Sequence, residues 1–239
     1  MAVPVEPAYA EPRDAATLVI IDSRQRVLLG KRRPAQVFAP GKFVFPGGSV
    51  NPADTEMQPG GRLRETERYP LLHDLNPASG ASSPEVFALA AIRETFEETG
   101  LLVGARQAKQ PPSAPKDWQS YVSHGCEPRL NSLTFIARAI TPPGRPRRFD
   151  ARFFLAPADD IVAQTGTHDG EFEALAWMAF AEARAQDLHS VTRSVLEETE
   201  HFLTLSARDR TLAPVPYFFE GPGGWHRDVI ARQPVSLGA

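Results

Sequence analysis

One segment, residues 82 to 101, constrains what this chain can fold into more than any other. Ser82 or Ser83 can cap the start of a helix, and Pro84 is tolerated in its first turn. Gly100 is placed to cap the end of that helix. Apolar residues recur between the caps every three or four positions and predict one stripe that faces a core: Val86, Leu89, Ile92 and Phe96. The pattern predicts a helix that packs against the centre of a globular domain.

The same helix carries three carboxylates on one face. Glu94, Glu97 and Glu98 stand at positions i, i+3 and i+4, so their side chains leave the helix together. Like charges this close destabilise a helix, and Arg93 is the only basic residue beside them in the sequence. A divalent cation would reverse the effect, since hard cations such as Mg²⁺ prefer carboxylate oxygen. The pattern indicates a metal site, with a solvated acidic helix face as the alternative.

The rest of the chain reads as an α/β or α+β domain built on a mixed sheet. A polar turn at 23–25 separates the first two apolar runs, which favours two paired strands. Strands are expected at 16–22, 26–32, 42–45, 131–140, 151–156 and 172–178, and further helices at 179–188 and 191–205. Strands and helices mixed in this order predict a central sheet with helices packed against it.

A sequence signature joins the expected strand at 42–45 to the acidic helix. The strand runs into Phe45-Pro46-Gly47-Gly48, Asp54 follows Gly48 after five residues, and the helix reads Arg93-Glu94-Thr95-Phe96-Glu97-Glu98-Thr99-Gly100-Leu101. This resembles the Nudix hydrolase family, whose signature is Gly, five residues, Glu, seven residues, then Arg-Glu-U-x-Glu-Glu-x-Gly-U, with U a bulky aliphatic. Seven of the nine fixed positions match; Asp54 replaces a Glu and Thr95 replaces U. An insertion of 31 residues separates the two halves of the signature.

The resemblance implies a Nudix-type mixed sheet sandwiched between helices. The expected organisation is a leader over residues 1–14, a Nudix domain over 15–210 with the insertion at about 55–83, and a tail over 211–239. A short helix is expected inside the insertion, whose role stays open between a lid, a substrate-selecting wall and a dimer contact. The tail is aromatic, with Tyr217, Phe218, Phe219 and Trp225, and packing or an oligomer contact is favoured over base stacking.

The resemblance also implies hydrolysis of a diphosphate that joins a nucleoside to another group, with Mg²⁺ or Mn²⁺ as the cofactor. Glu97 and Glu98 would be the principal ligands, and Glu94 a third ligand or the general base. A backbone carbonyl at Gly48 is a further candidate ligand. Arg93 is counted with the catalytic residues, where it would pair with a helix carboxylate and hold the loop.

Other candidate residues lie outside the helix. Asp54 either braces Arg93 or is a surface turn residue. Glu171 and Glu173 resemble the later loop in which some Nudix enzymes keep an additional ligand or base, with exposed loop residues as the alternative. A basic cluster suits a substrate phosphate, with a solvated loop as the alternative: Arg145, Arg147, Arg148 and Arg152.

The long insertion and the segment 140–154 resemble the peroxisomal coenzyme A diphosphatases of animals. That resemblance implies coenzyme A or acyl-coenzyme A as substrate, cleaved to adenosine 3′,5′-bisphosphate and (acyl-)phosphopantetheine. ADP-ribose, NADH or another nucleoside diphosphate derivative is the alternative substrate. A Nudix-fold nucleotide-binding or sensor protein without turnover is the alternative from another class, but it predicts loss of carboxylates that are all present here.

The resemblance implies a small-molecule nucleotide as the partner, and a homodimer is kept as an option, whereas composition argues against nucleic acid and a membrane. The formal net charge of −3 and the pI near 6.1 give no basic field for nucleic acid. The longest apolar run, residues 174–181, is too short to span a membrane, and the first residues do not read as a secretory signal. Cys126 is the only cysteine, so no internal disulfide can form, and a cytoplasmic location is expected. His124, His168 and His189 lack ligand spacing, so zinc is not suggested.

Overall fold

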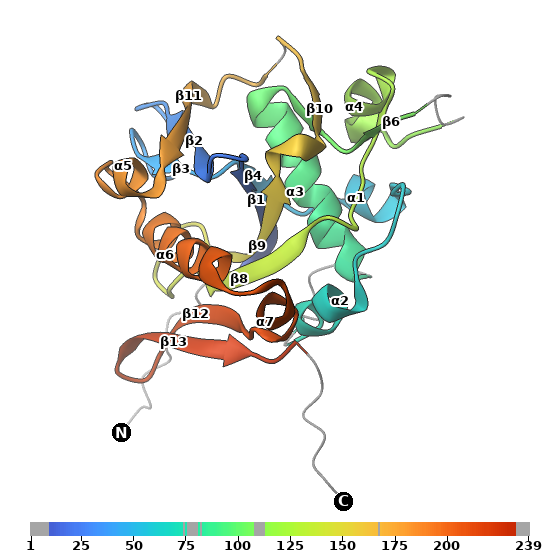
Figure 1. Cartoon of the computed structure of the whole chain (residues 1–239). Coiled ribbons are helices and arrows are strands. Elements are labelled where there is room, and N and C mark those ends of the chain that lie inside the picture. Colours follow the sequence, from blue (N-terminus) through green and yellow to red (C-terminus); the bar gives the residue numbers. More distant parts are fainter. Residues whose placement is uncertain are drawn as a thin grey trace, which may run out of the picture.

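A mixed sheet forms the centre of the molecule (Figure 1). The computed structural model describes residues 10–73, 75, 81, 83–107, 113–166 and 168–232. Nine strands of this part of the chain join one sheet, and seven of them follow in the order β11 (Phe172–Ala179), β2 (Arg26–Arg32), β1 (Arg13–Ile21), β9 (Phe149–Pro157), β8 (Thr134–Ile140), β12 (Val215–Gly221) and β13 (Gly224–Ile230). The short strands β3 (Phe43–Val44) and β4 (Gly47–Ser49) pair with β2 and β1.

The sheet contains both parallel and antiparallel pairs of strands. β1 lies parallel to β9 over its whole length, from Arg13 opposite Phe149 to Ile21 opposite Pro157. β8 runs antiparallel to β9, and β12 runs parallel to β8. The expected turn between β1 and β2 is confirmed: the Asp22 carboxylate accepts hydrogen bonds from the Arg24 and Arg26 amides, and the strands pair at Ile21 and Val27.

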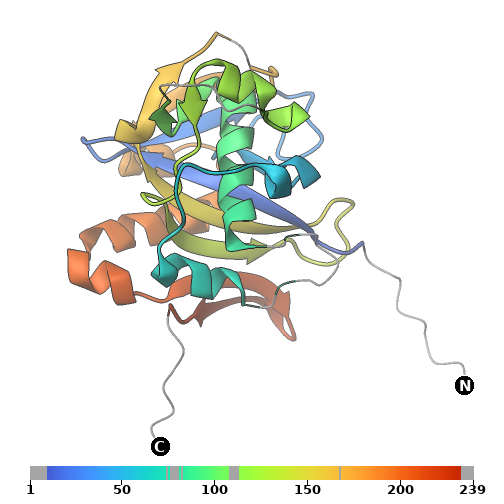
Figure 2. The ribbon, with the colours of Figure 1, turned by 90° about the vertical axis from the view of Figure 1, so that its right-hand side faces the viewer.

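Helices cover both faces of the sheet, as expected (Figure 2). Because side chains alternate along β1, Leu18 and Ile20 join the core under α3 (Pro84–Thr99), whereas Val19 and Ile21 join the core under α6 (Ser190–Thr204). Helix α5 (Phe180–Arg184) extends the second core and is shorter than the expected helix at 179–188.

Helix α3 begins and ends where its caps predict, with Gly100 in the left-handed conformation at φ 73°. The four residues of the predicted stripe are buried. The helix is nevertheless buried on more than one side, since Phe87 and a run of alanines are also inaccessible. The small residues let α3 lie close to the sheet. More of the helix surface is therefore buried than the single predicted stripe indicates.

The described part of the insertion packs beside α3. Residues 52–56 form α1 (Pro52–Glu56), and the expected short helix is α2 (Glu65–Leu71). In α2, the buried Glu67 accepts a hydrogen bond from the Phe135 amide at 2.8 Å and from the Arg232 guanidinium at 2.5 Å. The insertion is thereby tied to β8 and to the segment that follows β13. Residues 74, 76–80 and 82 lie outside the described residues.

The remaining elements border this core. They are β5 (Leu101–Val103) with β10 (Ile161–Gln164), β6 (Ala105–Arg106) with β7 (Cys126–Glu127), α4 (Gln119–Ser123), α7 (Ala207–Leu212) and the 3-10 helices η1 (Lys116–Trp118) and η2 (Ala158–Asp160). The segment expected as a tail from residue 211 contributes β12 and β13 to the central sheet. Among the described helices, none has the length and apolar character needed to cross a bilayer.

Candidate active site

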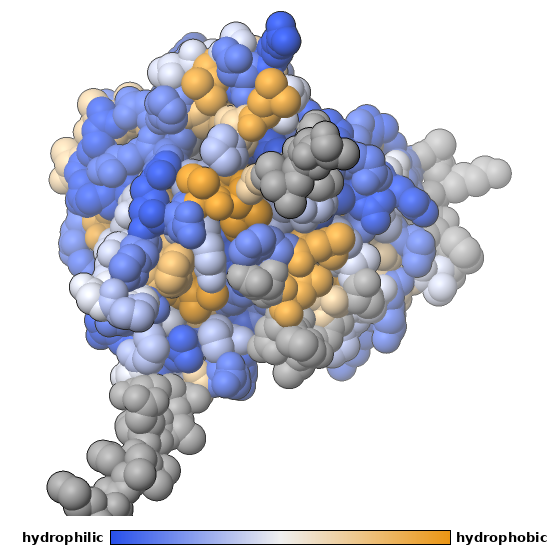
Figure 3. Space-filling model, turned by 90° about the horizontal axis from the view of Figure 1, so that it is seen from below, coloured by the Kyte–Doolittle hydropathy of each residue, from blue (hydrophilic) through white to orange (hydrophobic). Residues whose placement is uncertain are grey.

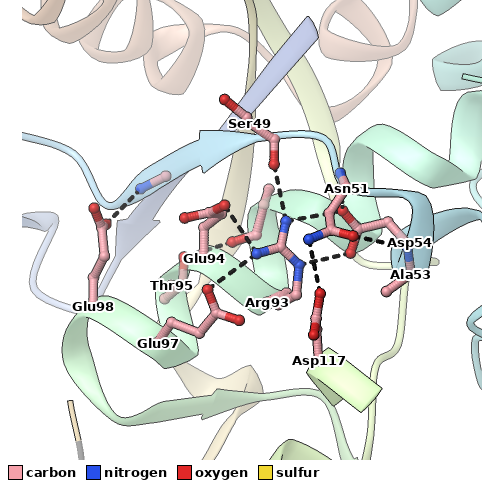
Figure 4. A network of polar contacts seen from close by, with 12 residues as sticks. Ser49, Asn51, Ala53, Asp54, Arg93, Glu94, Thr95, Glu97, Glu98 and Asp117 are labelled. Carbon is pink, nitrogen blue, oxygen red and sulfur yellow. Dashed lines mark hydrogen bonds and ion pairs between the residues drawn. The ribbon is translucent and has the colours of Figure 1, made fainter. Parts of the chain in front are cut away.

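Arg93 lies at the centre of a network that joins α3, α1 and β4 (Figure 4). Its guanidinium donates to both carboxylate oxygens of Asp54, at 2.8 and 2.9 Å, and to the backbone carbonyl of Ser49 at 2.9 Å. The remaining nitrogen donates to Glu94 at 2.9 Å and to Glu97 at 3.0 Å. The expected pairing of Arg93 with a helix carboxylate is confirmed, and one side chain fixes three carboxylates.

Asp54 is fully buried, so its interpretation as a surface turn residue is wrong. It occupies the third position of α1, and its carboxylate also accepts from the Asn51 amide and from the Trp118 indole nitrogen, at 2.8 and 3.0 Å. These bonds and the two from Arg93 satisfy both oxygens of the buried charge. The brace between Asp54 and Arg93 is therefore present although 39 positions separate the two residues.

Two glycines bring β4 against the carboxylates of α3. The Gly47 amide donates to Glu98 at 2.8 Å (Figure 4). A Cβ on Gly47 would lie 2.5 Å from the Ala16 carbonyl oxygen, and a Cβ on Gly48 would lie 2.4 Å from a Glu94 oxygen. At Gly47 the neighbouring atoms belong to the backbone and φ is 155°, so this position requires glycine, whereas at Gly48 a Cβ would displace the end of the Glu94 side chain. The Gly-Gly pair thus lets backbone and carboxylates share one wall.

Burial dominates the electrostatics of the three glutamates. It raises the pKa of Glu94 to about 7 against the opposing effect of Arg93. It also raises the pKa of Glu98 well above its ordinary value, and the neighbouring Glu171 adds to this increase. Burial outweighs Arg93 at Glu97 as well and raises its pKa. Burial therefore makes the ionised form of these carboxylates costly in the protein alone, and a bound cation would stabilise that form.

Burial and ion pairing act against each other at Arg93. Burial alone would lower its pKa, but the hydrogen bond with Asp54 and the charges of Glu94, Asp54 and Glu97 outweigh it, so the pKa is raised. Arg93 stays protonated throughout the physiological range, and it holds the carboxylates as a permanent cation.

A cavity of about 220 Å³ opens beside these residues. Glu94, Glu98, Gly47 and Gly48 line one end of it. Apolar side chains from the sheet form much of the remaining wall, among them Val44, Phe45, Ala139, Ala151 and Phe153. The cavity combines an acidic end with an apolar wall, which is the usual make-up of a small-molecule site.

The other acidic candidates divide between the inside and the outside of this cavity. Glu171 lines it and forms an ion pair with Arg32, which lines it as well. Glu173 instead pairs with Lys31 at 2.6 Å and is exposed. Glu97 is more exposed than Glu94 and Glu98 and does not line the cavity. Glu94, Glu98 and Glu171 are therefore the carboxylates nearest a ligand in this space.

The donor set fits a hard divalent cation by its chemistry. Carboxylate and backbone oxygens gather where β4 meets α3, with no sulfur ligand among them. In the described ranges, no three acidic, histidine or cysteine side chains converge as a finished ligand set. The reason is visible in Figure 4, where Glu94 and Glu97 turn to Arg93 and Glu98 turns to the Gly47 amide. Binding a cation would require rotation of these side chains.

The structure divides the predicted basic cluster. Arg152 is a core residue that pairs with Asp14 and Asp150 and lies over the Phe87 ring, so its prediction as a substrate ligand is wrong. The cause is strand alternation: Ala151 and Phe153 face the cavity, and Arg152 faces α3.

Arg148 is also occupied within the protein. It donates to the backbone carbonyls of Thr141 and Ala10, at 3.0 and 2.9 Å. Arg147 lines the cavity beside the glutamates, and Arg147 and Arg145 both line an adjoining cavity. The candidate substrate ligands of this cluster are thus reduced from four to two.

Several site residues escaped sequence reasoning. Trp118 binds Asp54 from η1, far along the chain, and no local pattern marks it. His189 and Phe38 line the cavity with their rings 4.9 Å apart, and His189 precedes the first turn of α6. The helix start after His189 was detectable, but the direction in which that helix points was not.

Three comparisons place this geometry among known proteins. The family model described as the NUDIX domain matches residues 11–199. A human protein named acyl-coenzyme A diphosphatase NUDT19 is 29% identical over 177 residues, which cover 54% of this chain and 47% of that protein. A Caenorhabditis elegans protein named putative nudix hydrolase 7 is 28% identical over 175 residues, covering 63% of this chain and 46% of that protein. The chain spans about half the length of these curated relatives.

A solved structure supports the same assignment at the level of the fold. The NUDIX hydrolase of Alicyclobacillus acidocaldarius superposes with a TM-score of 0.60 and 28% sequence identity. The match covers 80% of this chain and 91% of that one. Because the family model spans well over half of the chain and includes the whole site, the chain belongs to the Nudix family.

Proposed function

We propose that this chain is a divalent-cation-dependent hydrolase that cleaves the diphosphate of a nucleoside diphosphate-linked substrate, with coenzyme A or acyl-coenzyme A as the preferred substrate. One observation carries the proposal: Arg93 holds Asp54, Glu94 and Glu97 beside the buried Glu98 at the end of a cavity. The NUDIX match supports the same reaction type.

Mg²⁺ or Mn²⁺ suits the all-oxygen donor set, and Glu94, Glu97 and Glu98 with a Gly48 carbonyl would hold it. The bound cation supplies neutralisation of phosphate charge and acidification of the attacking water. Glu94 serves either as a ligand or as the base that accepts the water proton. Arg93 does not reach the cavity wall and acts by positioning, since it fixes Glu94 and Glu97 relative to α1 and β4.

The reaction adds one water molecule across the diphosphate. The water oxygen forms a bond to one phosphorus, and the bond from that phosphorus to the bridging oxygen breaks. The bridging oxygen leaves with the other phosphate, and the two protons of water are shared between the products and the solvent. From coenzyme A this gives adenosine 3′,5′-bisphosphate and phosphopantetheine.

Two observations support coenzyme A over other diphosphates. Relatives with 27–29% identity are named acyl-coenzyme A diphosphatases. The cavity also continues toward Arg145 and Arg147, which suit a phosphate additional to the diphosphate. The described part of the insertion contributes no residue to the cavity wall, so the substrate contacts are expected from the sheet and α6 rather than from the insertion.

The test is product analysis by mass spectrometry. Purified protein with Mg²⁺ or Mn²⁺ is incubated with coenzyme A, acetyl-coenzyme A, ADP-ribose, NADH and diadenosine polyphosphates. Adenosine 3′,5′-bisphosphate from the coenzyme A compounds is the expected result. Cleavage of only the other compounds would keep the reaction and overturn the substrate, and no cleavage at all would favour a binding protein.

The assignment of the carboxylates needs a matched pair of variants. Glu97→Gln removes one ligand charge from α3 and is expected to lower turnover at least about 10²-fold, because even changes behind the ligands cost 10 to 100-fold. Glu197→Gln makes the same change at an exposed position of α6 and is expected to keep the wild-type rate. Equal rates in the two variants would overturn the role of Glu97.

A further inference from the structure

The cavity beside the glutamates continues into a second one of about 500 Å³. The two share five lining residues and therefore form one groove: Phe38, Thr141, Arg147, His189 and Val191. The second cavity ends at Trp225, on the β12–β13 hairpin. One continuous surface thus leads from Glu94 and Glu98 to an aromatic side chain at the far edge of the sheet.

The outer half of this groove is positively charged. Arg145 and Arg147 line it, both are exposed, and neither has an ion pair or hydrogen bond within the part of the chain that the structure describes. Among the described residues, the side chains that line this half include no acidic one. Burial lowers the pKa of the His189 imidazole, and the charges of Lys42, Arg145 and Arg32 lower it further, which shows that the positive field of these side chains reaches His189.

The start of α6 faces the same space. His189 precedes the helix without a side-chain cap, and the first helical hydrogen bond runs from the Arg193 amide to the His189 carbonyl. Ser190, Val191 and Thr192 all line the groove, and their amides have no acceptor among the described residues. The uncapped end of a helix of 15 residues adds partial positive charge to the two guanidinium groups.

A largely buried cation, Arg32, lines the inner half of the groove. Arg32 is 7% exposed and lines the first cavity. Its Nε atom is buried and has no hydrogen-bond partner among the residues that the structure describes, although another nitrogen of the group pairs with Glu171. An unmatched buried donor is costly unless a ligand supplies the acceptor. The groove therefore offers anion-binding groups along its length and not only at its rim.

Trp225 closes the outer end with a flat apolar surface. It is 47% exposed, and its ring lies nearly parallel to Phe218 at 6.4 Å, which holds it in place from one side. Figure 3, viewed from the side of the hairpin, shows apolar patches scattered among hydrophilic ones, and the exposed large apolar residues of β13 are Trp225 and Val229. A supported, half-exposed indole beside two arginines is suited to stacking on a nucleobase.

We infer that the outer half of the groove binds the nucleoside end of a substrate that carries a phosphomonoester besides its diphosphate. We call this half the phosphomonoester subsite, and it consists of Arg145, Arg147, the start of α6 and Trp225. Arg145, Arg147 and the α6 amides bind the phosphomonoester, and Trp225 stacks on the base. The inference rests on the proposed function. It implies that the group joined to the nucleoside through the diphosphate lies on the side of Glu94 and Glu98 that is away from the subsite.

Binding without turnover tests the subsite directly. The probes are adenosine 3′,5′-bisphosphate and AMP, titrated calorimetrically into the full chain. The wild type is expected to bind the bisphosphate at least tenfold more tightly. Arg145→Gln/Arg147→Gln is expected to lose this preference, whereas Arg129→Gln/Arg208→Gln, with the same change of charge on exposed arginines outside the groove, is expected to keep it. Trp225→Ala should weaken both probes about equally, and Trp225→Phe should restore most of the loss.

Hydrolysis of coenzyme A and 3′-dephospho-coenzyme A separates the two proposals. If both are cleaved with equal kcat/KM, or if Arg145→Gln/Arg147→Gln keeps the tenfold preference, the subsite is overturned and the reaction stands. If neither compound nor any other diphosphate is cleaved, the proposed function is overturned, while a tenfold preference for the bisphosphate in binding would still support the subsite. Circular dichroism spectra that match the wild type show that the variants fold.

Discussion

Replacing Asp54 with Asn tests whether the brace around Arg93 holds the site together. The Asp54 carboxylate accepts four hydrogen bonds, two from Arg93 and one each from Trp118 and the Asn51 amide. An amide nitrogen in place of one oxygen leaves two of these donors without an acceptor. It also leaves the Arg93 guanidinium, 3% exposed, without its buried counter-charge.

The magnitude follows from burial. Removing one partner of a buried ion pair costs about 3–5 kcal/mol, because the other charge stays desolvated. Arg93 keeps Glu94 and Glu97, so we expect a loss near the lower end, about 3 kcal/mol. For a chain of this length that corresponds to a Tm lower by about 6–12 °C. Affinity for the divalent cation should also fall, by about 10 to 100-fold, since Arg93 orients the carboxylates.

Urea unfolding monitored by circular dichroism measures the stability change, with an unchanged dependence on urea as the check that the folded state is preserved. Asp187→Asn is the matched control: Asp187 pairs with Lys42 at the surface at 2.6 Å, and its loss should cost less than about 1 kcal/mol. A loss below about 1 kcal/mol for Asp54→Asn as well would refute the reasoning.

The remaining predictions concern charge, backbone and the anchor of the insertion. In metal-free protein, Glu94 has a pKa of about 7 against 4.5 ordinarily, so the folded state binds its proton more tightly than the unfolded state does. The free energy of unfolding should therefore fall as pH rises from 4.5 to about 7, which unfolding curves in EDTA at pH 5 and 7.5 measure. Glu94→Gln should reduce this fall, and an equal fall in that variant would contradict the assignment. Gly48→Ala pushes the flexible Glu94 carboxylate aside, so turnover should fall at least about tenfold in steady-state assays while Tm changes little; a wild-type rate would contradict this. Arg232→Met removes a partner of the buried Glu67, so the free energy of unfolding should fall by about 3–5 kcal/mol. Denaturation with guanidinium chloride measures this loss, and Arg208→Met should not share it.

Much of the site could be predicted because its signals are local. Caps and spacing define α3 within residues 83–100, and the i, i+3, i+4 positions place three glutamates on it whatever the rest of the chain does. The partner of Arg93 is not local, since Asp54 is 39 positions away across an insertion. Only the resemblance to a known signature pointed to it, and residue types alone left a surface turn equally plausible.

What could not be predicted depends on how distant elements meet. Arg152 and Arg147 are five positions apart, yet one is buried under α3 and the other lines the groove, because β9 begins at Phe149 and fixes which side chains face which way. Trp225 reaches the groove because β12 pairs with β8, a contact between strands about 80 residues apart. The periodicity of the sequence shows neither where β9 begins nor which strand pairs with β12.

The most direct test measures bound Mn²⁺ and turnover on the same samples. Electron paramagnetic resonance counts free Mn²⁺ while coenzyme A cleavage is followed, in the wild type, in Glu94→Gln/Glu98→Gln and in Glu197→Gln. We expect turnover to rise in step with bound Mn²⁺ in the wild type and in Glu197→Gln, and both to be lost in the double variant. Cleavage by the double variant at the wild-type rate, or turnover that ignores Mn²⁺ occupancy, would contradict the assignment of the α3 carboxylates as the catalytic metal site.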